Sequence, residues 1–292
     1  MLLLTAAIWG FAFVPQRMAT AYVTPLAFNG LRFALGAVSL IPLIFWQNRQ
    51  WRWPERQTLL GGGLAGLMIF FAAFFQQVGL ISTSAGKAGF ITGLYVIFVP
   101  ILGTIWGSRT RLSIWGGGVL AISGLYLLSV TDRFTIAQGD LWVLVGAVFW
   151  ALQIIVLERY AKRANILQLA FTQFTTCSIL SLSAALFFED VQMSGILGGG
   201  LLPILYNGVI SVGIAYTLQV FAQKDAHPAY AALILSLEGV FAAIAGWLIL
   251  AESFTPRGML GCALILSGLI LAQLHPVSDG ISTLPANNPD GS

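Results

Sequence analysis

Apolar residues run along this chain in long stretches that are separated by short polar segments. Because a bilayer core about 30 Å thick is crossed by about 20 helical residues, each stretch is long enough for one membrane-spanning helix. Ten such stretches lie near residues 2–19, 24–46, 58–80, 87–107, 112–130, 140–158, 166–188, 201–221, 229–250 and 257–274. The polar breaks between them are too short to hold a soluble domain. The pattern therefore predicts an all-α integral membrane protein with ten transmembrane helices.

Composition supports a membrane protein and argues against several other classes. The chain is 58% hydrophobic and 9% charged, with a mean hydropathy of +0.86, whereas about 25% of the residues of a soluble domain are charged. Cys177 and Cys262 both lie inside apolar stretches, so we expect no disulfide framework, no metal site and no cofactor. The net charge of +3 comes from basic residues in short loops, which is typical of a topology signal rather than of nucleic-acid binding.

The distribution of Lys and Arg predicts the orientation of the helices. With a cytoplasmic N-terminus, nine basic residues fall in cytoplasmic loops: Arg49, Arg52, Arg56, Arg109, Arg111, Arg159, Lys162, Arg163 and Lys224. Four fall on the opposite side: Arg17, Lys87, Arg133 and Arg257. We therefore expect both termini on the cytoplasmic side of the cell inner (plasma) membrane. The first stretch has no basic leader and no cleavage site, so it is expected to be a retained helix, and polar residues 275–292 are expected to be disordered.

The second half of the chain repeats the first at a nearly constant offset. AAIWGFAFV at 6–14 matches AVFWALQII at 147–155, and LAISGLYLL recurs as LILSGLILA 144 residues later. Each half holds five predicted helices, and because five is odd the second half enters the membrane upside down. We expect residues 1–130 and 140–274 to form two inverted five-helix repeats. Inverted repeats are common in secondary transporters, whose substrate sites lie near the bilayer midplane between the halves.

Small residues line one face of the predicted helix at 87–107 and include Gly86, directly before it. This stripe consists of Gly86, Gly89, Gly93, Pro100, Gly103 and Gly107. In the predicted helix at 229–250, Ala242 and Gly246 offer a matching small surface. Small faces let helix backbones approach closely where lipid removes the hydrophobic incentive for association. We expect tight packing here, with added flexibility where Pro100 interrupts the backbone ladder.

Several segments resemble the EamA-type members of the drug/metabolite transporter superfamily. They include LTAAIWGFAFVPQR, SAGKAGFITGLYVIFVPILG and YAALILSLEGVFAAIAGWLILAES, and the resemblance covers nearly the whole chain up to about residue 274. It implies a bundle of two inverted five-helix repeats, with the third, fourth, eighth and ninth helices lining a central cavity. It also implies that the fifth and tenth helices pack at the periphery. Two positions depart from the family pattern: Gly239 stands where a proline is common, and GSRTRLS lacks the acidic residue usual after the fourth helix, while its counterpart Glu252 remains.

One carboxylate lies in the middle of a predicted span. Glu238 is the tenth residue of the stretch at 229–250, so at 1.5 Å per residue it lies about 15 Å in, near the midplane. Placing an acid there costs about 2.5–3.5 kcal/mol on insertion scales. Three interpretations remain open: a structural ion pair or hydrogen-bonded acid, a contact to a substrate amine, or a group that carries a proton to couple transport.

Two basic residues are candidates for a structural or coupling role beside Glu238. Arg32 lies at similar depth in the second predicted helix and is the expected ion-pair partner of Glu238. Lys87 begins the fourth helix near the outer surface, where its stem can snorkel or its charge can attract substrate carboxylates.

The remaining candidate substrate-binding residues are amides and aromatic rings. Gln77 and Gln219 are repeat-related, as are Trp9 and Trp150, and Tyr95 adds a ring in the fourth helix. Amides suit a polar cavity wall because they donate and accept hydrogen bonds without a charge penalty. The same side chains can instead hold helices together or fill the core.

Motifs of catalysis are not found in the sequence. His227 and His275 lie at loop edges, the pair Glu189–Asp190 is interpreted as a solvated loop, and no glycine-rich phosphate loop is present. We therefore expect a secondary transporter that exports small amphiphilic metabolites such as amino acids by alternating access. A multidrug efflux pump is one alternative, and an intramembrane enzyme on lipid-linked substrates is another. The expected partners are a small-molecule substrate and the lipid bilayer, without nucleic acid, and a homodimer is an open alternative to a monomer.

Overall fold

The chain folds as a bundle of helices. The computed structural model describes residues 1–48, 54–106, 112–129, 137–161, 164–223 and 234–273, and every regular element in these ranges is helical. The elements are α1 (Leu2–Ala19), α2 (Pro25–Asn48), α3 (Arg56–Gly79), α4 (Ala85–Thr92), α5 (Tyr95–Gly103), η1 (Thr104–Trp106), α6 (Leu112–Ser129), α7 (Gln138–Ala161), α8 (Ile166–Phe188), α9 (Met193–Gly195), η2 (Ile196–Gly200), α10 (Leu201–Leu205), η3 (Tyr206–Ala215), α11 (Tyr216–Gln223), α13 (Glu238–Leu250) and α14 (Pro256–Gln273).

The helices agree closely with the apolar stretches of the sequence. In the described ranges, nine helical spans are long and apolar enough to cross a membrane, and α13 is a shorter apolar helix. The predicted ninth stretch begins at 229, and its first residues lie outside the described ranges, as do Gly107 and the predicted tail at 275–292. The all-α membrane class is confirmed, and the count of ten helices is approximately supported.

Three of the predicted spans, the fourth, the eighth and the ninth, are not single regular α-helices. The fourth is divided into α4 and α5. The eighth begins at Met193 rather than near residue 201, and it contains a ten-residue π-helical segment, η3, between α10 and α11. π-helical turns are rare and are frequent at functional sites. The ninth span has a turn at residues 236–237, directly before α13.

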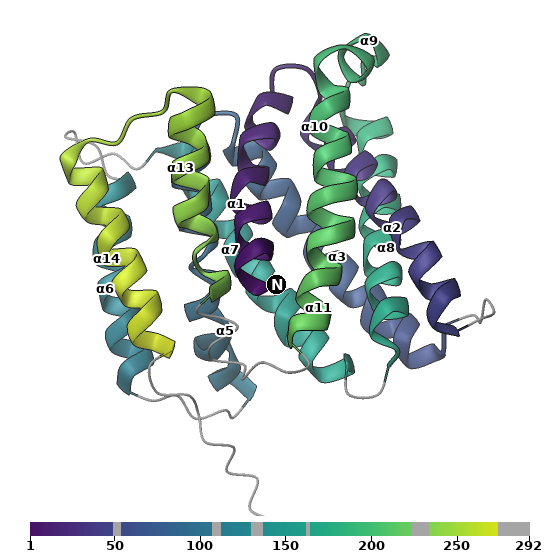
Figure 1. Cartoon of the computed structure of the whole chain (residues 1–292), viewed down its shortest axis with the longest axis horizontal. Coiled ribbons are helices and arrows are strands. Elements are labelled where there is room, and N and C mark those ends of the chain that lie inside the picture. The colour runs from purple at the N-terminus through teal and green to yellow at the C-terminus, as the bar shows by residue number, and fades with distance from the viewer. Residues whose placement is uncertain (49–53, 107–111, 130–136, 162–163, 224–233, 274–292) are drawn as a thin grey trace, which may run out of the picture.

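The helices pack side by side in a broad bundle (Figure 1). The α6–α14 pair forms one edge, at the left of Figure 1, and the α2–α8 pair forms the opposite edge. Between the edges, α3 packs against α7, and α1 packs against α13 and η3. The α4 helix lies between α13 and α7. We refer to the end that holds the connections 20–24, 80–84, 189–192 and 251–255 as the upper end, as it is drawn in Figure 1.

Small residues set the closest approaches between helices. The expected contact between the glycine stripe and the ninth helix is present: a side chain at Gly89 would collide with the Cβ of Ala242, which is fully buried. At the α6–α14 edge, a Cβ on Gly117 would lie 2.5 Å from the carbonyl oxygen of Gly268. Such faces bring backbones into van der Waals contact, which drives helix association in lipid.

Candidate functional site

Two spans are interrupted at equivalent places in the two halves of the chain. In the fourth span, α4 ends at Thr92 and α5 begins at Tyr95, and the Leu94 N–H donates to the Ile91 carbonyl at 3.2 Å. In the ninth span, α13 begins at Glu238, and the Leu237 N–H donates to the Ile234 carbonyl at 3.2 Å. These i→i−3 bonds mark a tightened turn, and such turns inside helices often act as hinges.

The two interruptions are related by the repeat in the sequence. An offset of 143 carries Leu94 to Leu237 and Tyr95 to Glu238, and it falls between the offsets of 141 and 144 found elsewhere in the chain. The segments GLYVIF and SLEGVF share Leu and Phe in register at this offset. The two predicted site residues Tyr95 and Glu238 therefore each open the second half of an interrupted helix.

Glu238 is buried inside the bundle with unused hydrogen-bonding capacity. Its side chain is 4% exposed, and its Oε1 has no hydrogen-bond partner in the described part of the chain. It stands in the first turn of α13, where the helix dipole favours a negative charge. The Tyr95 phenol lies within electrostatic range of its carboxylate. A buried acid with a free oxygen can accept a bond from a substrate ammonium or hydroxyl group.

The expected ion pair between Arg32 and Glu238 is not formed. Within the described residues the ion pair is Lys87–Asp140, and the Arg32 guanidinium lies over the ring of Phe33. The reason is the packing order: α13 packs mainly on α1 and α4, whereas α2 packs mainly on α8 and η3. The sequence placed both residues at similar depth, but depth does not specify which neighbour a side chain faces.

A buried amide network joins four helices near Gln76. The Gln76 Nε2 donates to the Gln16 Oε1 at 2.9 Å, and the Trp150 indole donates to the Gln76 Oε1 at 2.9 Å. The Thr92 hydroxyl donates to the same Gln76 oxygen at 3.4 Å. The Gln77 Nε2 donates to the Gln16 carbonyl oxygen at 2.9 Å. This network links α1, α3 and α7 to the last residue of α4, next to the interruption of the fourth span.

A second network lies beside α7, α8 and the eighth span. The Gln153 Nε2 donates to the Gln173 Oε1 at 3.1 Å, and the Gln173 Nε2 donates to the Tyr216 hydroxyl at 3.0 Å. The Tyr216 ring lies 6.3 Å from that of Trp9, whose indole donates to the Ser211 carbonyl at 3.0 Å. Gln153 and Gln173 were missed by the sequence analysis, although each is an amide within an apolar stretch.

The repeat-related candidates occupy different environments. Trp9 and Trp150 each donate an indole hydrogen bond to a neighbouring span, to the eighth and the third respectively. Gln77 is fully buried, and its Oε1 has no partner in the described structure. Gln219 is half-buried on α11 and belongs to neither network. A substrate-binding role for these four residues stays a prediction.

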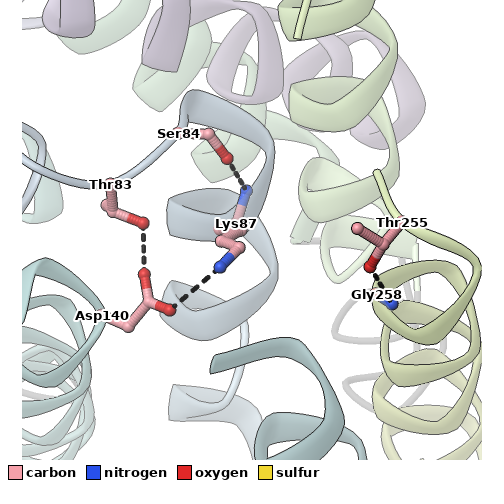
Figure 2. A network of polar contacts seen from close by, with 6 residues as sticks. All are labelled: Thr83, Ser84, Lys87, Asp140, Thr255 and Gly258. Carbon is pink, nitrogen blue, oxygen red and sulfur yellow. Dashed lines mark hydrogen bonds and ion pairs between the residues drawn. The ribbon is translucent and has the colours of Figure 1, made fainter. Parts of the chain in front are cut away.

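Lys87 is not free at the upper end of the bundle. Its Nζ lies 3.4 Å from the Asp140 Oδ2 of α7, and the Thr83 hydroxyl donates to the other oxygen of this carboxylate (Figure 2). Asp140 is 1% exposed and Lys87 is 31% exposed. The Ser84 hydroxyl caps α4 by accepting from the Lys87 N–H at 3.2 Å. The sequence predicted a free Lys87 charge at the cavity mouth. The pairing with Asp140 was not predicted, because Asp140 lies at a polar break of the sequence.

Two carboxylates cap the upper ends of distant helices. The Glu189 oxygens accept from the N–H groups of Leu26 and Ala27 at 2.9 and 3.0 Å. The pair Glu189–Asp190 lies in a connection, as predicted, and Asp190 is exposed, but Glu189 is half-buried and caps α2. The Glu252 oxygens accept from the N–H groups of Ala85 and Gly86 at 2.7 and 3.0 Å. Each carboxylate satisfies two free donors of a helix N-terminus and complements its dipole.

The backbone after α13 directs Glu252 toward α4. Ala251 adopts the left-handed conformation, with φ of 53° and ψ of 30°, and the Glu252 N–H donates to the Gly246 carbonyl at 3.1 Å. This ends α13 and turns the chain. Gly246 leaves the space that the Glu252 carboxylate occupies. In the described ranges, no group of three or more His, Cys, Asp or Glu residues could hold a metal ion.

Most of this chain is similar to known proteins, in sequence and in fold. Residues 1–130 and 137–274 match the EamA-like transporter family. A protein of Archaeoglobus fulgidus named "Uncharacterized transporter" is 33% identical over 278 residues, covering 94% of this chain and 85% of that protein. The transporter YwfM of Bacillus subtilis is 30% identical over 298 residues, covering 94% of this chain and 93% of its own. A solved crystal structure at 21% identity has a TM-score of 0.65 and covers 93% of this chain and 94% of that one, which shows a shared fold.

Proposed function

Because this chain belongs to the EamA-like transporter family, we propose that it is a secondary transporter that exports small amphiphilic metabolites such as amino acids. It does so across the plasma membrane by alternating access between two inverted repeats, residues 1–130 and 140–274. Both termini lie in the cytoplasm, as nine basic residues against four favour. The upper end is then the outer face of the membrane.

The observation that carries this proposal is the pair of interrupted spans. Secondary transporters with inverted repeats place their substrate between discontinuous helices near the midplane. Here the interruptions lie at residues 93–94 and 236–237, and each is followed by a polar side chain, Tyr95 or Glu238. The N-terminal ends of α5 and α13 thus meet the same central region, where the Glu238 Oε1 has no hydrogen-bond partner among the described residues.

The contacts between the halves support a twofold relation. The 144-residue offset carries Gly117 to Gly261 and Gly124 to Gly268. In the structure Gly117 packs on Gly268 and Gly124 packs on Gly261. Exchanging each residue for its repeat-related counterpart therefore converts one contact into the other. In the same way, α1 packs on the eighth and ninth spans while α7 packs on the third and fourth. A twofold axis in the membrane plane accounts for both facts.

Polar contacts join the outer end of α4 to α7 and to the α13–α14 connection. Glu252 binds the first N–H groups of α4, and Asp140 of α7 binds Lys87 and Thr83. Opening toward the outside requires the outer half of the fourth span to leave α7 or the α13–α14 connection. Because Lys87 is 31% exposed, its charge is partly screened by solvent, and we expect the pair to be weak enough to break during transport. We assign these contacts to the outer gate.

The chemistry of the centre favours a small solute with an amino group and an apolar part. Glu238 offers a negative charge to an ammonium group, and Tyr95, Trp9 and Trp150 offer rings that attract cations and cover apolar surface. The glutamine networks add donors and acceptors without further charge. Amino acids and related metabolites have this combination, whereas a multidrug pump would prefer larger, mostly apolar cations.

Substrate flux in proteoliposomes tests the proposal. Purified protein is reconstituted, and counterflow is measured for a panel of radiolabelled amino acids, organic acids and lipophilic cationic dyes. We expect counterflow of at least one amino acid and none of the dyes. Movement of dyes alone would replace the proposal with multidrug efflux, and movement of no small solute would overturn it.

A further inference from the structure

A buried arginine in the second span has no use in the transport site described above. Arg32 is the eighth residue of α2, and its side chain is 4% exposed. Its guanidinium carbon lies 5.3 Å from the ring centroid of Phe28 and 4.9 Å from that of Phe33. The rings cover faces of the guanidinium plane, but its N–H groups point along the plane and need acceptors.

The chain supplies Arg32 with no anionic partner in the described structure. The helical segments that pack most on α2 are α8, η3, α3 and α10, and none of these or α2 itself contains an Asp or Glu residue. The carboxylate of Glu189 contacts the start of α2, where it accepts from the N–H groups of Leu26 and Ala27 and not from Arg32. No hydrogen bond from Arg32 is found among the described residues, and its buried Nε has no partner. A guanidinium cannot lose its charge as a buried lysine can, so it must be neutralised by something other than these helices.

A second unpartnered donor lies on the same face of α2. Asn29 precedes Arg32 by three residues, which places both on one side of the helix. Asn29 is fully buried, and neither its Nδ2 nor its Oδ1 has a hydrogen-bond partner in the described part of the chain. Buried amides in folded proteins are almost always bonded. Two adjacent polar side chains that both lack partners indicate one common ligand rather than two separate defects.

This face of α2 is directed at the π-helical part of the eighth span. Gly36, one turn beyond Arg32, faces the Gly208 carbonyl and Val212, and a Cβ on Gly208 would lie 3.0 Å from the Arg32 carbonyl oxygen. Asn207 in the same segment is fully buried, and within the described ranges its Oδ1 also lacks a partner. The polar interface therefore continues from α2 onto η3, an element that is itself unusual in conformation.

We propose that Arg32 and Asn29 form an anion-binding site between α2, α8 and the eighth span. The guanidinium supplies the charge and a fork of N–H donors, and the Asn29 amide supplies a further donor. The ligand is one small anion, either an inorganic anion such as chloride or the carboxylate of a small organic acid. The site accepts only one anion because one cation is available to neutralise it.

This site is separate from the transport centre. The eighth span lies between them, since the Trp9 indole of α1 bonds to Ser211 on one side while Gly208 and Val212 face α2 on the other. The anion would fix the eighth span against α2 without lying in the path of the substrate. The inference therefore does not depend on which solute the protein carries.

Thermal unfolding of the purified full-length protein tests the site. The protein is held at constant ionic strength in gluconate, which is too bulky for a buried site, and is titrated with chloride in one arm and with acetate in the other. We expect the melting temperature of the wild type to rise with concentration in at least one arm. A rise with chloride alone identifies an inorganic anion, and a rise with acetate identifies a carboxylate. An unchanged melting temperature in both arms overturns the proposal.

Variants assign the effect to this face of α2. Arg32→Met keeps the apolar stem between the rings and is expected to abolish the anion dependence, while Arg32→Lys should retain it with an affinity reduced about tenfold. If Arg32→Met does not fold, Asn29→Ala serves instead and should raise the half-saturating anion concentration several-fold. Arg56→Gln, which removes an exposed charge at the start of α3, is the matched control and should leave the titration unchanged. Anion dependence that survives in Arg32→Met would refute the site.

Discussion

The Lys87–Asp140 contact provides a quantitative test of the outer gate. Lys87→Met leaves the Asp140 carboxylate, which is 1% exposed, with Thr83 as its partner. Removing one partner of a fully buried pair costs about 3–5 kcal/mol. Because Lys87 is 31% exposed, part of its interaction is already screened by solvent, and we expect about 1–3 kcal/mol. Asp140→Asn should cost less, about 0.5–1.5 kcal/mol, since the lysine can be hydrated and the amide can still accept from Thr83.

A double-mutant cycle separates this interaction from the individual side chains. The free energy of unfolding in mixed detergent micelles is measured for the wild type, both single variants and the double variant. We expect a coupling energy of about 1–2 kcal/mol, so that the double variant is less destabilised than the sum of the single variants. A cysteine placed in the 80–84 connection should also react faster with a membrane-impermeant reagent in the variants. Additive single effects, with a coupling energy below about 0.3 kcal/mol, would show that the contact does not hold the gate.

Three further perturbations have defined outcomes. In thermal unfolding, Gly89→Leu should destabilise the protein by about 3 kcal/mol or more, because the new side chain collides with Ala242. Gly63→Ala should leave the stability unchanged or raise it by about 0.5–1 kcal/mol, because no atom lies within 4 Å of the new Cβ. Gln76→Leu should lower the free energy of unfolding by about 1–3 kcal/mol, because the Trp150 indole N–H loses its acceptor. A variant as stable as the wild type would show that the network does not contribute to stability. Glu252→Ala should lower the free energy of unfolding by about 0.5–2 kcal/mol, because it removes the cap of α4. Glu252→Gln should lower it by less, because the amide oxygen can still accept a hydrogen bond. Equal losses in the two variants would argue against capping.

The sequence predicted the helices because a membrane imposes a strong constraint. A span that satisfies its backbone internally and crosses about 30 Å of hydrocarbon must be a long apolar helix. The small faces of α4 and α13 were also predictable. Gly89 follows Gly86 by three residues and Ala242 precedes Gly246 by four, and both spacings place the small residues on one face of a helix. The interruption at Gly93 and Leu94 was not predicted, because both residues are compatible with an apolar stretch and leave its hydropathy unchanged.

The candidate site was predicted only in part. The depth of Glu238 follows from counting residues, but its neighbours depend on the rotation and packing of the helices. For this reason the expected Arg32 pairing was wrong: the Arg32 guanidinium lies over the ring of Phe33, and the Glu238 Oε1 has no hydrogen-bond partner among the described residues. Asp140 and Glu189 were missed as functional contacts because they stand next to polar breaks, where charged residues are ordinarily solvated. Pairing across such breaks depends on three-dimensional proximity, which the linear pattern does not encode.

Flux through the Glu238→Gln variant tests the central claim most directly. The claim is that Glu238, at the interrupted ninth span, belongs to the substrate site of an alternating-access transporter. The amino acid that the wild type moves fastest is followed in proteoliposomes, with and without a pH gradient, for wild type, Glu238→Gln and the exposed control Glu55→Gln. We predict that Glu238→Gln folds with a similar melting temperature, because an amide preserves the shape, and that its flux falls at least tenfold while Glu55→Gln matches the wild type. Flux through Glu238→Gln that equals wild-type flux and responds equally to the pH gradient would contradict the claim.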